Sequence, residues 1–244
     1  MFRRTARSLL AFVMITAGTV LGVGATAGAA HADECYTWSR TLSQGSSGGD
    51  VTQLQIRVAG WVTSGERLSY DGQYGARTAA AVKKFQAAYG LPADGVAGPQ
   101  TFGKIYALQD PDCTPAHFSY GELNRCNSNW SGGAVSAATA KANALKTMWK
   151  LEAMRHALGD VPISVSSGFR SYACNSAVGG SATSRHLYGD AADLTGSPSF
   201  CRLAQQARTH GFSEILGPGY PGHNDHTHVA FDPSPYWSAP NCGI

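Results

Sequence analysis

Histidines gather near the end of this sequence, at a spacing that suits a metal site. His223, His226 and His228 lie within six residues of one another. The residues around the last two are typical of a β-strand, in which alternate side chains share a face. His226 and His228 would then face one way, and Thr227 and Val229 the other. The spacing therefore predicts two imidazoles on one surface.

A second segment upstream, Ser184–Leu194, supplies further metal-binding side chains. It holds His186, Asp190 and Asp193 among glycine and alanine residues, which leave room for an ion. Zinc prefers imidazole nitrogen and carboxylate oxygen, and a catalytic zinc keeps three protein ligands with one position open for water, whose pKa falls to about 7. His186, one of the two aspartates and one histidine of the later strand would complete such a site. Spacing alone does not decide between Asp190 and Asp193, or between His226 and His228.

Signatures of other hydrolases are absent or misplaced. No serine is followed three residues later by lysine, as in the serine peptidases that penicillin acylates. No HExxH motif occurs either. Residues 45–49 fit Gly-x-Ser-x-Gly, but they lie in a glycine- and serine-rich stretch, so we interpret this match as accidental. These hydrolase signatures therefore give no competing site.

The candidate ligands belong to a segment that mixes helices with short strands. Apolar residues at spacings of three and four predict a long helix that begins after a capping Ser136 and ends at Gly159. Three strands and one further helix are expected at 163–167, 214–216, 227–231 and 199–210. Because no regular β-α-β alternation is present, we expect an α+β fold with a mainly antiparallel sheet.

An internal repeat marks a smaller segment nearer the N-terminus. The pattern Asp-Gly-x-x-Gly-x-x-Thr occurs at 71–78 and again at 94–101, 23 residues later. Asp-Gly favours a tight turn, the second glycine permits a positive φ, and the threonine can cap the helix that follows. Apolar residues at helical spacing after each copy, and once before the first, predict three short helices. Such a unit is too small for a deep catalytic cleft.

The first 32 residues are typical of an export signal. Three arginines form a basic start, and the apolar run Leu9–Val23 is short for a membrane span. Small residues at 30 and 32 place the expected cleavage before Asp33. We expect a secreted monomer that makes no membrane contact once this signal is removed.

The charge and the cysteine content of the chain agree with secretion. Of 19 lysines and arginines, three lie in the export signal, which leaves 16 against 16 acidic residues and argues against a nucleic-acid partner. A hydrophobic content of 43% excludes wholesale disorder. All six cysteines follow the expected cleavage site, and no two have a Cys-x-x-Cys spacing, so three disulfides are expected.

The later segment resembles the zinc D-Ala-D-Ala peptidases of the M15 family. The resemblance is carried by Ser-x-His-x-x-Gly-x-Ala-x-Asp over 184–193 and by Asp-x-x-His over 225–228, with further matches at 167–171 and 218–228. The earlier segment, roughly 41–108, resembles the three-helix peptidoglycan-binding domains of wall hydrolases. We therefore expect a signal peptide over 1–32, a peptidoglycan-binding domain over 33–112 and a zinc peptidase domain over 113–244.

The resemblance implies roles for individual residues. The single zinc ion would be held by His186, Asp193 and His228. Arg170 would bind the carbonyl or the terminal carboxylate of the substrate through paired donors. Related enzymes have a glutamate as the base three residues before the last zinc histidine; here Asp225 occupies that position, and His226 competes with it. We favour Asp225.

The resemblance also implies an activity and a disulfide pattern. The expected reaction is hydrolysis of the terminal D-alanyl-D-alanine bond of peptidoglycan peptides; the alternative is an endopeptidase that cuts stem peptides or cross-links. Asp190 would either orient a ligand histidine or lie in solvent. The cysteines would pair in sequential order, as Cys35–Cys113, Cys126–Cys174 and Cys201–Cys242.

Overall fold

The computed structural model describes residues 35–244, so the export signal predicted over 1–32 lies outside the described residues. The elements follow one another as α1 (Gly49–Arg57), α2 (Ala76–Ala88), α3 (Pro99–Ala107), α4 (Tyr120–Leu123), α5 (Ala137–Ala157), β1 (Ser164–Ser167), α6 (Tyr172–Ala177), the 3₁₀ helix η1 (Arg185–Tyr188), β2 (Ala191–Thr195), α7 (Phe200–Ala207), β3 (Glu214–Leu216), β4 (Thr227–Ala230), β5 (Tyr236–Ser238) and the 3₁₀ helix η2 (Pro240–Cys242). Every predicted helix and strand is present, and α4, α6, β2 and β5 were not predicted. None of the described helices is both long and apolar enough for a membrane span.

The first repeat is held by a glutamine from the helix that precedes it. Gln55 of α1 is buried, and its Nε2 donates to Asp71 Oδ1 at 2.9 Å and to Thr78 Oγ1 at 3.3 Å. Its Oε1 accepts from the backbone N–H of Gly72 at 3.0 Å. One side chain thus ties the Asp-Gly turn to the start of the next helix.

The second repeat uses the same arrangement one helix later. Gln86 of α2 donates to Asp94 Oδ1 and Thr101 Oγ1, both at 3.0 Å, and accepts from Gly95 N–H at 2.8 Å. The interpretation of the two threonines as helix caps is therefore wrong. The residues at the cap positions are glycines, and each threonine lies buried in the first turn because it bonds to the glutamine.

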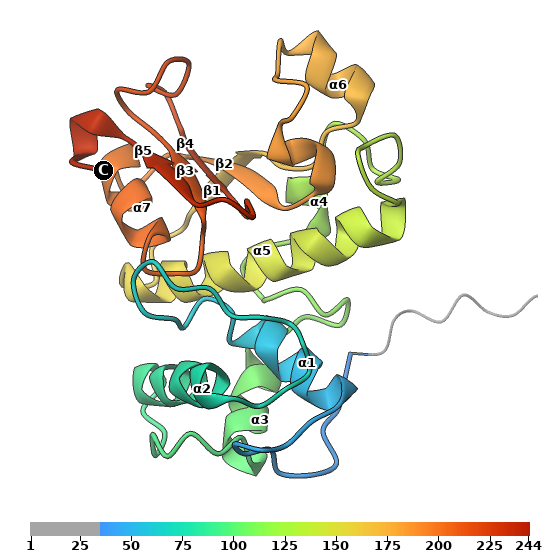
Figure 1. Ribbon diagram of the computed structural model, residues 1–244, viewed down its shortest axis with the longest axis vertical. Helices are drawn as coiled ribbons and strands as arrows, with labels where there is room; N and C mark the ends of the chain where they lie inside the picture. The colour runs from blue at the N-terminus through green and yellow to red at the C-terminus, as the bar shows by residue number, and fades with distance from the viewer. Residues whose placement is uncertain (1–34) are drawn as a thin grey trace, which may run out of the picture. The chain divides into compact units, whose positions relative to one another are not determined.

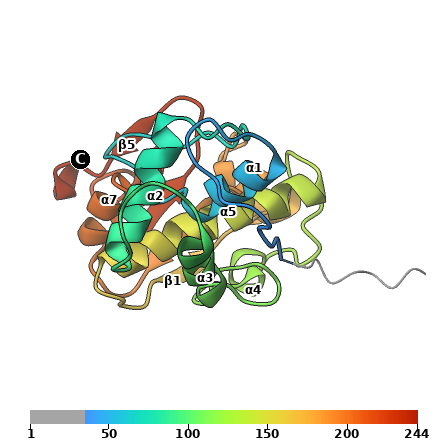
Figure 2. The ribbon, with the colours of Figure 1, turned by 90° about the horizontal axis from the view of Figure 1, so that it is seen from below.

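The three helices of this segment pack against the long helix α5. Trp149 and Ala153 of α5 belong to the same apolar cluster as the buried residues of α1, α2 and α3. A Cβ placed on Gly60 would lie 2.5 Å from Ala153 Cβ and 3.0 Å from Lys150 Cα, so only glycine permits this approach. In Figures 1 and 2, α5 crosses the molecule next to α1, with α2 and α3 beyond it. All the described residues belong to one compact unit.

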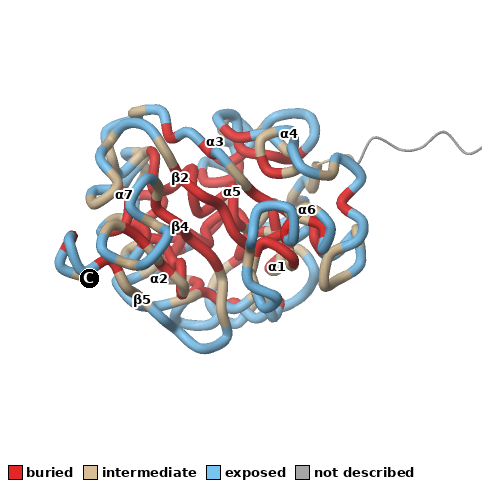
Figure 3. The backbone as a smooth tube through the Cα atoms, turned by 90° about the horizontal axis from the view of Figure 1, so that it is seen from above, coloured by how far each residue is buried: buried red, intermediate tan, exposed pale blue. Residues whose placement is uncertain are grey.

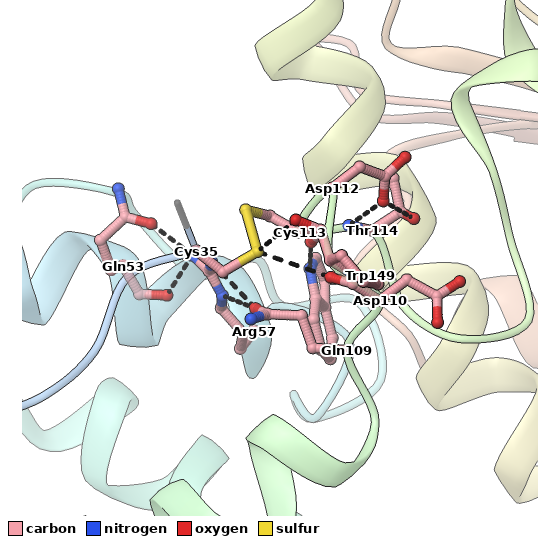
Figure 4. Close-up of a disulfide and its surroundings, with 10 residues drawn as sticks. Cys35, Gln53, Arg57, Gln109, Asp110, Asp112, Cys113, Thr114 and Trp149 are labelled. Carbon is pink, nitrogen blue, oxygen red and sulfur yellow. Dashed lines mark hydrogen bonds between the residues drawn. A yellow bond between two sulfur atoms is a disulfide. The ribbon is translucent and has the colours of Figure 1, made fainter. Parts of the chain in front are cut away.

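Residues 110–115, between the two segments, are held by contacts to other parts of the fold (Figure 4). Cys113 among them forms a disulfide with Cys35, and its carbonyl accepts from Trp149 Nε1 at 3.3 Å. Beside them the buried Arg57 of α1 donates to Gln109 Oε1 at 3.1 and 3.2 Å. All three expected disulfides are present, as Cys35–Cys113, Cys126–Cys174 and Cys201–Cys242.

A five-stranded sheet in the order β1-β2-β4-β3-β5 forms the centre of the second segment. All neighbours are antiparallel except β3 and β5, which confirms the expected α+β class with a mainly antiparallel sheet. One face packs on α5 and α7 through residues such as Leu194, Ile215 and Val229. Figure 3 shows β2, β4 and α5 as buried backbone in the middle of the fold. The other face of the sheet carries the polar residues.

Candidate active site

The register of β2 and β4 brings an aspartate and a histidine together. Asp193 is the direct partner of His228 across the two strands, so their side chains share a face. Asp193 Oδ1 lies 2.9 Å from His228 Nδ1. Thr227 and Val229 point to the opposite face, where Thr227 Oγ1 donates to the carbonyl of Phe200 and Val229 lies in the core. The strand alternation predicted for these residues is confirmed.

His186 reaches the same point from η1. A Cβ on Gly189, which has a φ of 75°, would meet the carbonyl oxygen of Ala140 on α5, so glycine lets η1 pack tightly there. His186 Nδ1 lies 2.5 Å from the carbonyl oxygen of Gly168, and since a carbonyl only accepts, Nδ1 carries the hydrogen. The lone pair on Nε2 then faces Asp193 Oδ1, 3.1 Å away.

These three side chains fit a zinc ion. Ligand atoms from His186, Asp193 and His228 all lie within 4.8 Å of one another, and the three side chains are 3%, 8% and 6% exposed. Tetrahedral zinc with bonds of about 2.0–2.2 Å separates its ligand atoms by about 3.3–3.5 Å, close to the spacing seen here. Among the described residues, no other group of three or more His, Cys, Asp or Glu side chains has a spacing that suits a metal ion.

The electrostatics of the group also favour a cation. Burial lowers the pKa of His228, but hydrogen bonds to Asp193 and Glu214 outweigh it and raise this pKa to about 9. Burial raises the pKa of Asp193, but the two histidines outweigh it and hold that pKa well below its usual range. The carboxylates therefore create a negative potential that attracts a proton in the absence of metal and would attract a divalent ion in its place.

Arg170 contacts the aspartate rather than standing free in the cleft. Its Nη2 donates to Asp193 Oδ2 at 2.6 Å, and its Nε donates to Ser167 Oγ at 2.9 Å. Ser167 is the last residue of β1 and pairs with Asp193 across β1 and β2. The guanidinium thus holds the second carboxylate oxygen and leaves Oδ1 for the two histidines.

The two residues considered as the base lie just before β4 and differ in where they point. The Asp225 side chain is 88% exposed, and its Oδ1 accepts from His226 Nδ1 at 2.8 Å. The other ring nitrogen, His226 Nε2, lies 3.6 Å from Asp193 Oδ1. Of the two, the imidazole therefore faces the ligand group, and Asp225 lies behind it.

The site lies in a cleft of about 590 Å³. One wall is the segment from Val178 to Ser184, which follows α6, and the other is formed by Tyr220, His223 and Tyr236. Asp190, left open above, is paired with Arg185 rather than with a ligand histidine, and burial raises its pKa to about 6 despite that ion pair.

The sequence analysis did not find Glu214, which lies on β3 on the same face of the sheet. Its Oε1 is 2.9 Å from His228 Nε2, and its side chain is 20% exposed. The only sequence signal was an acidic residue at the start of an apolar strand. Arg185, Tyr220 and Tyr236 also line the cleft, and the sequence analysis gave them no role.

Comparison with known proteins agrees with this arrangement. The family described as Peptidase M15 matches residues 116–230, and the family described as putative peptidoglycan binding domain matches residues 47–105. The zinc D-Ala-D-Ala carboxypeptidase of Streptomyces albus G is 65% identical over 238 residues, which cover 96% of this chain and 93% of that protein.

Two further relatives match a smaller part of this chain. A probable N-acetylmuramoyl-L-alanine amidase of Bacillus licheniformis is 39% identical over 80 residues, which cover 31% of this chain and 22% of the amidase. The crystal structure of the SleB N-terminal domain is 34% identical, covers 30% of this chain and 96% of its own, and has a TM-score of 0.27. The 65% identity extends over nearly the whole length of one zinc carboxypeptidase, and the Peptidase M15 match includes His186, Asp193 and His228. This chain therefore belongs to the M15 family of zinc peptidases and carries a peptidoglycan-binding segment ahead of its peptidase fold.

Proposed function

We propose that this chain is secreted and removes the terminal D-alanine from D-alanyl-D-alanine ends of peptidoglycan peptides. The observation that carries the proposal is the buried group of His186, Asp193 and His228 at the cleft, in a chain 65% identical to a carboxypeptidase of that specificity. The domain division at 112 and 113 and a monomeric state belong to the same proposal. The helical segment would hold the enzyme on the cell wall.

The zinc would be held by His186 Nε2, Asp193 Oδ1 and His228 Nδ1. When bound, zinc acts as a Lewis acid that polarises the scissile carbonyl and makes water acidic enough to attack near neutral pH. The protein orients the ligand atoms through hydrogen bonds. The Gly168 carbonyl accepts from Nδ1 of His186 and so leaves Nε2 for the metal, and Arg170 binds Oδ2 of Asp193 and so leaves Oδ1.

Proton transfer is assigned to His226, with Asp225 as its partner. Asp225 accepts the Nδ1–H of the ring, which leaves the Nε2 lone pair toward the ligand group. His226 Nε2 would take the proton from the attacking water and later give it to the leaving amine of D-alanine. Asp225 stabilises the imidazolium that forms between these two steps, as a carboxylate does for a catalytic histidine elsewhere.

Arg170 would bind the substrate with the donors that the protein leaves over. A guanidinium has five N–H groups, and Ser167 and Asp193 account for two of them. We assign the others to the terminal carboxylate of the peptide, which a planar cation recognises well. Such a contact favours cleavage next to a free C-terminus over cleavage inside a chain.

The test is hydrolysis of an N-terminally blocked tripeptide that ends in D-alanyl-D-alanine. We expect free D-alanine to be released, to stop after zinc is removed by a chelator, and to return when zinc is added. The matched substrate with an amidated C-terminus should be cleaved poorly. Release of D-alanine at full rate from metal-free protein would overturn the zinc mechanism, and efficient cleavage of the amide would favour an endopeptidase instead.

A further inference from the structure

We propose that Glu214 is a positioning residue that fixes the ring orientation and the zinc-binding nitrogen of His228. The inference rests on the proposed function of this site and adds a residue to it. Glu214 belongs to β3, which lies beyond β4 from Asp193, so the carboxylate meets His228 from the side opposite to the other ligands.

The sheet register makes this contact a property of the backbone. Leu216 pairs with His228 and Glu214 pairs with Ala230, so Glu214 and His228 are diagonal neighbours on one face of β3 and β4. Glu214 Oε1 lies 2.9 Å from His228 Nε2. A glutamate at this register position has the reach to bond the far nitrogen of the ring.

The bond decides which nitrogen of His228 is left for zinc. Each ring nitrogen faces a carboxylate, which accepts and does not donate, so without metal both nitrogens carry a hydrogen. Zinc would replace the hydrogen on Nδ1, which lies toward Asp193, while Glu214 keeps the hydrogen on Nε2. A ring held at both nitrogens cannot rotate to present Nε2 to the metal. A charged acceptor also makes the imidazole a stronger donor to a metal, as outer carboxylates do at other metal sites.

The two ligand histidines are therefore held by different acceptors. His186 donates to a backbone carbonyl, that of Gly168, which no side-chain substitution removes. His228 depends on a side chain, so its orientation can be tested by mutation. Asp190 offers a matched control, because it is also a buried carboxylate beside the site but pairs with Arg185 and not with a histidine.

The experiment compares zinc affinity in the full-length protein for wild type, Glu214→Ala, Glu214→Gln and Asp190→Asn. Affinity is measured by competition with a chromophoric chelator, and unfolding of the metal-free proteins is followed in parallel. We expect Glu214→Ala to bind zinc about 10–100-fold more weakly. Glu214→Gln keeps a neutral acceptor and should lose less, and Asp190→Asn should keep the affinity of the wild type.

Two further readouts separate positioning from a loss of folding. The cobalt-substituted Glu214→Ala protein should show an altered visible absorption spectrum, and saturating zinc should restore most of its peptidase activity. Wild-type zinc affinity in both Glu214 variants, with an unchanged cobalt spectrum, would overturn the inference. If Glu214→Ala does not fold, the isosteric glutamine variant decides by the same measurements.

The outcomes also separate this inference from the proposed function. A wild-type protein that binds zinc through a Glu214-dependent site but releases no D-alanine refutes the function and keeps the inference. If the wild type releases D-alanine but the Glu214 variants keep the zinc affinity and the cobalt spectrum of the wild type, the function is supported and the inference is refuted.

Discussion

The glutamines of the helical segment are neutral buried polar groups, whereas the histidines of the sheet belong to a buried charged group. Gln55 and Gln86 have their amide donors and acceptors paired within their own repeats. At the active site, two imidazole nitrogens converge on one oxygen of Asp193. The first arrangement is neutral, whereas in the second His228 lies between two carboxylates and holds a proton whose place a cation can take. A neutral buried network supports structure, whereas a buried group of imidazoles and a carboxylate that converge on one point indicates a metal ion.

The largest expected effect is loss of the metal from the group of His186, Asp193 and His228. Removal of zinc, or His228→Ala, should reduce kcat/KM by about 10³-fold or more, because the Lewis acid contributes several kcal/mol to the barrier. Hydrolysis of a D-Ala-D-Ala peptide and metal analysis of the same samples measure this. Full activity in a zinc-free sample would show that these three side chains have another purpose.

The next effect separates the two residues before β4. His226→Ala should lower kcat by about 10²–10⁴-fold, the usual contribution of a general base. Asp225→Ala should cost less, since the imidazole stays in place without its partner. Zinc content of both variants serves as the control, and it should match the wild type. A larger loss with Asp225→Ala than with His226→Ala would restore Asp225 as the base.

The helical clusters should respond in stability and not in chemistry. Gln55→Ala leaves the buried N–H of Gly72 without its partner, at a cost of about 1–3 kcal/mol in the free energy of unfolding. Urea unfolding measures the change, and the exposed Gln100→Ala on α3 is the control. The hydrolysis of a small peptide should stay within a factor of two of the wild type. A loss of turnover with unchanged stability would contradict the distinction between the two clusters.

The smallest effect concerns Lys150 of α5, a buried cation between the two regions. Burial lowers its pKa to about 8, and its Nζ donates to the carbonyl of Gly211 at 2.9 Å. An unfolded lysine keeps its proton up to a pH of about 10.5. Between these two values the unfolded chain binds more protons, so stability rises with pH, by at most about 1.4 kcal/mol per pH unit.

Lys150→Met is expected to remove this contribution. The free energy of unfolding of the wild type, measured in urea from pH 7.5 to 9.5, should rise relative to that of the variant. Parallel curves for the two proteins would show that the buried amine does not titrate in this range.

Elements with strong local periodicity were predictable from sequence. The helix over Ala137–Ala157 begins at its predicted cap, with Ser136 Oγ accepting from Thr139 N–H. The strand β2 was missed because all but its last residue are buried, so Ala191–Thr195 has no polar alternation to reveal a strand.

The choice of ligands shows a similar limit. The resemblance supplied His186, Asp193 and His228, but the spacing left two pairs open until the register of β2 and β4 was known. The role of Glu214 could not be predicted from sequence, because it depends on the pairing of β3 with β4 and a strand of three residues carries no local signal for its partner. The orientation of Asp225 depends on the turn before β4, and only the resemblance indicated that it would face the metal.

The shared helix α5 has a consequence for how the enzyme meets a polymer. The helical bundle and the catalytic sheet both pack on α5. Gly60 lets the bundle approach this helix closely, and the Cys35–Cys113 disulfide joins the start of the bundle to the segment that follows it. Under the proposed function, a glycan strand bound by the helical bundle would therefore reach the catalytic cleft in one fixed orientation.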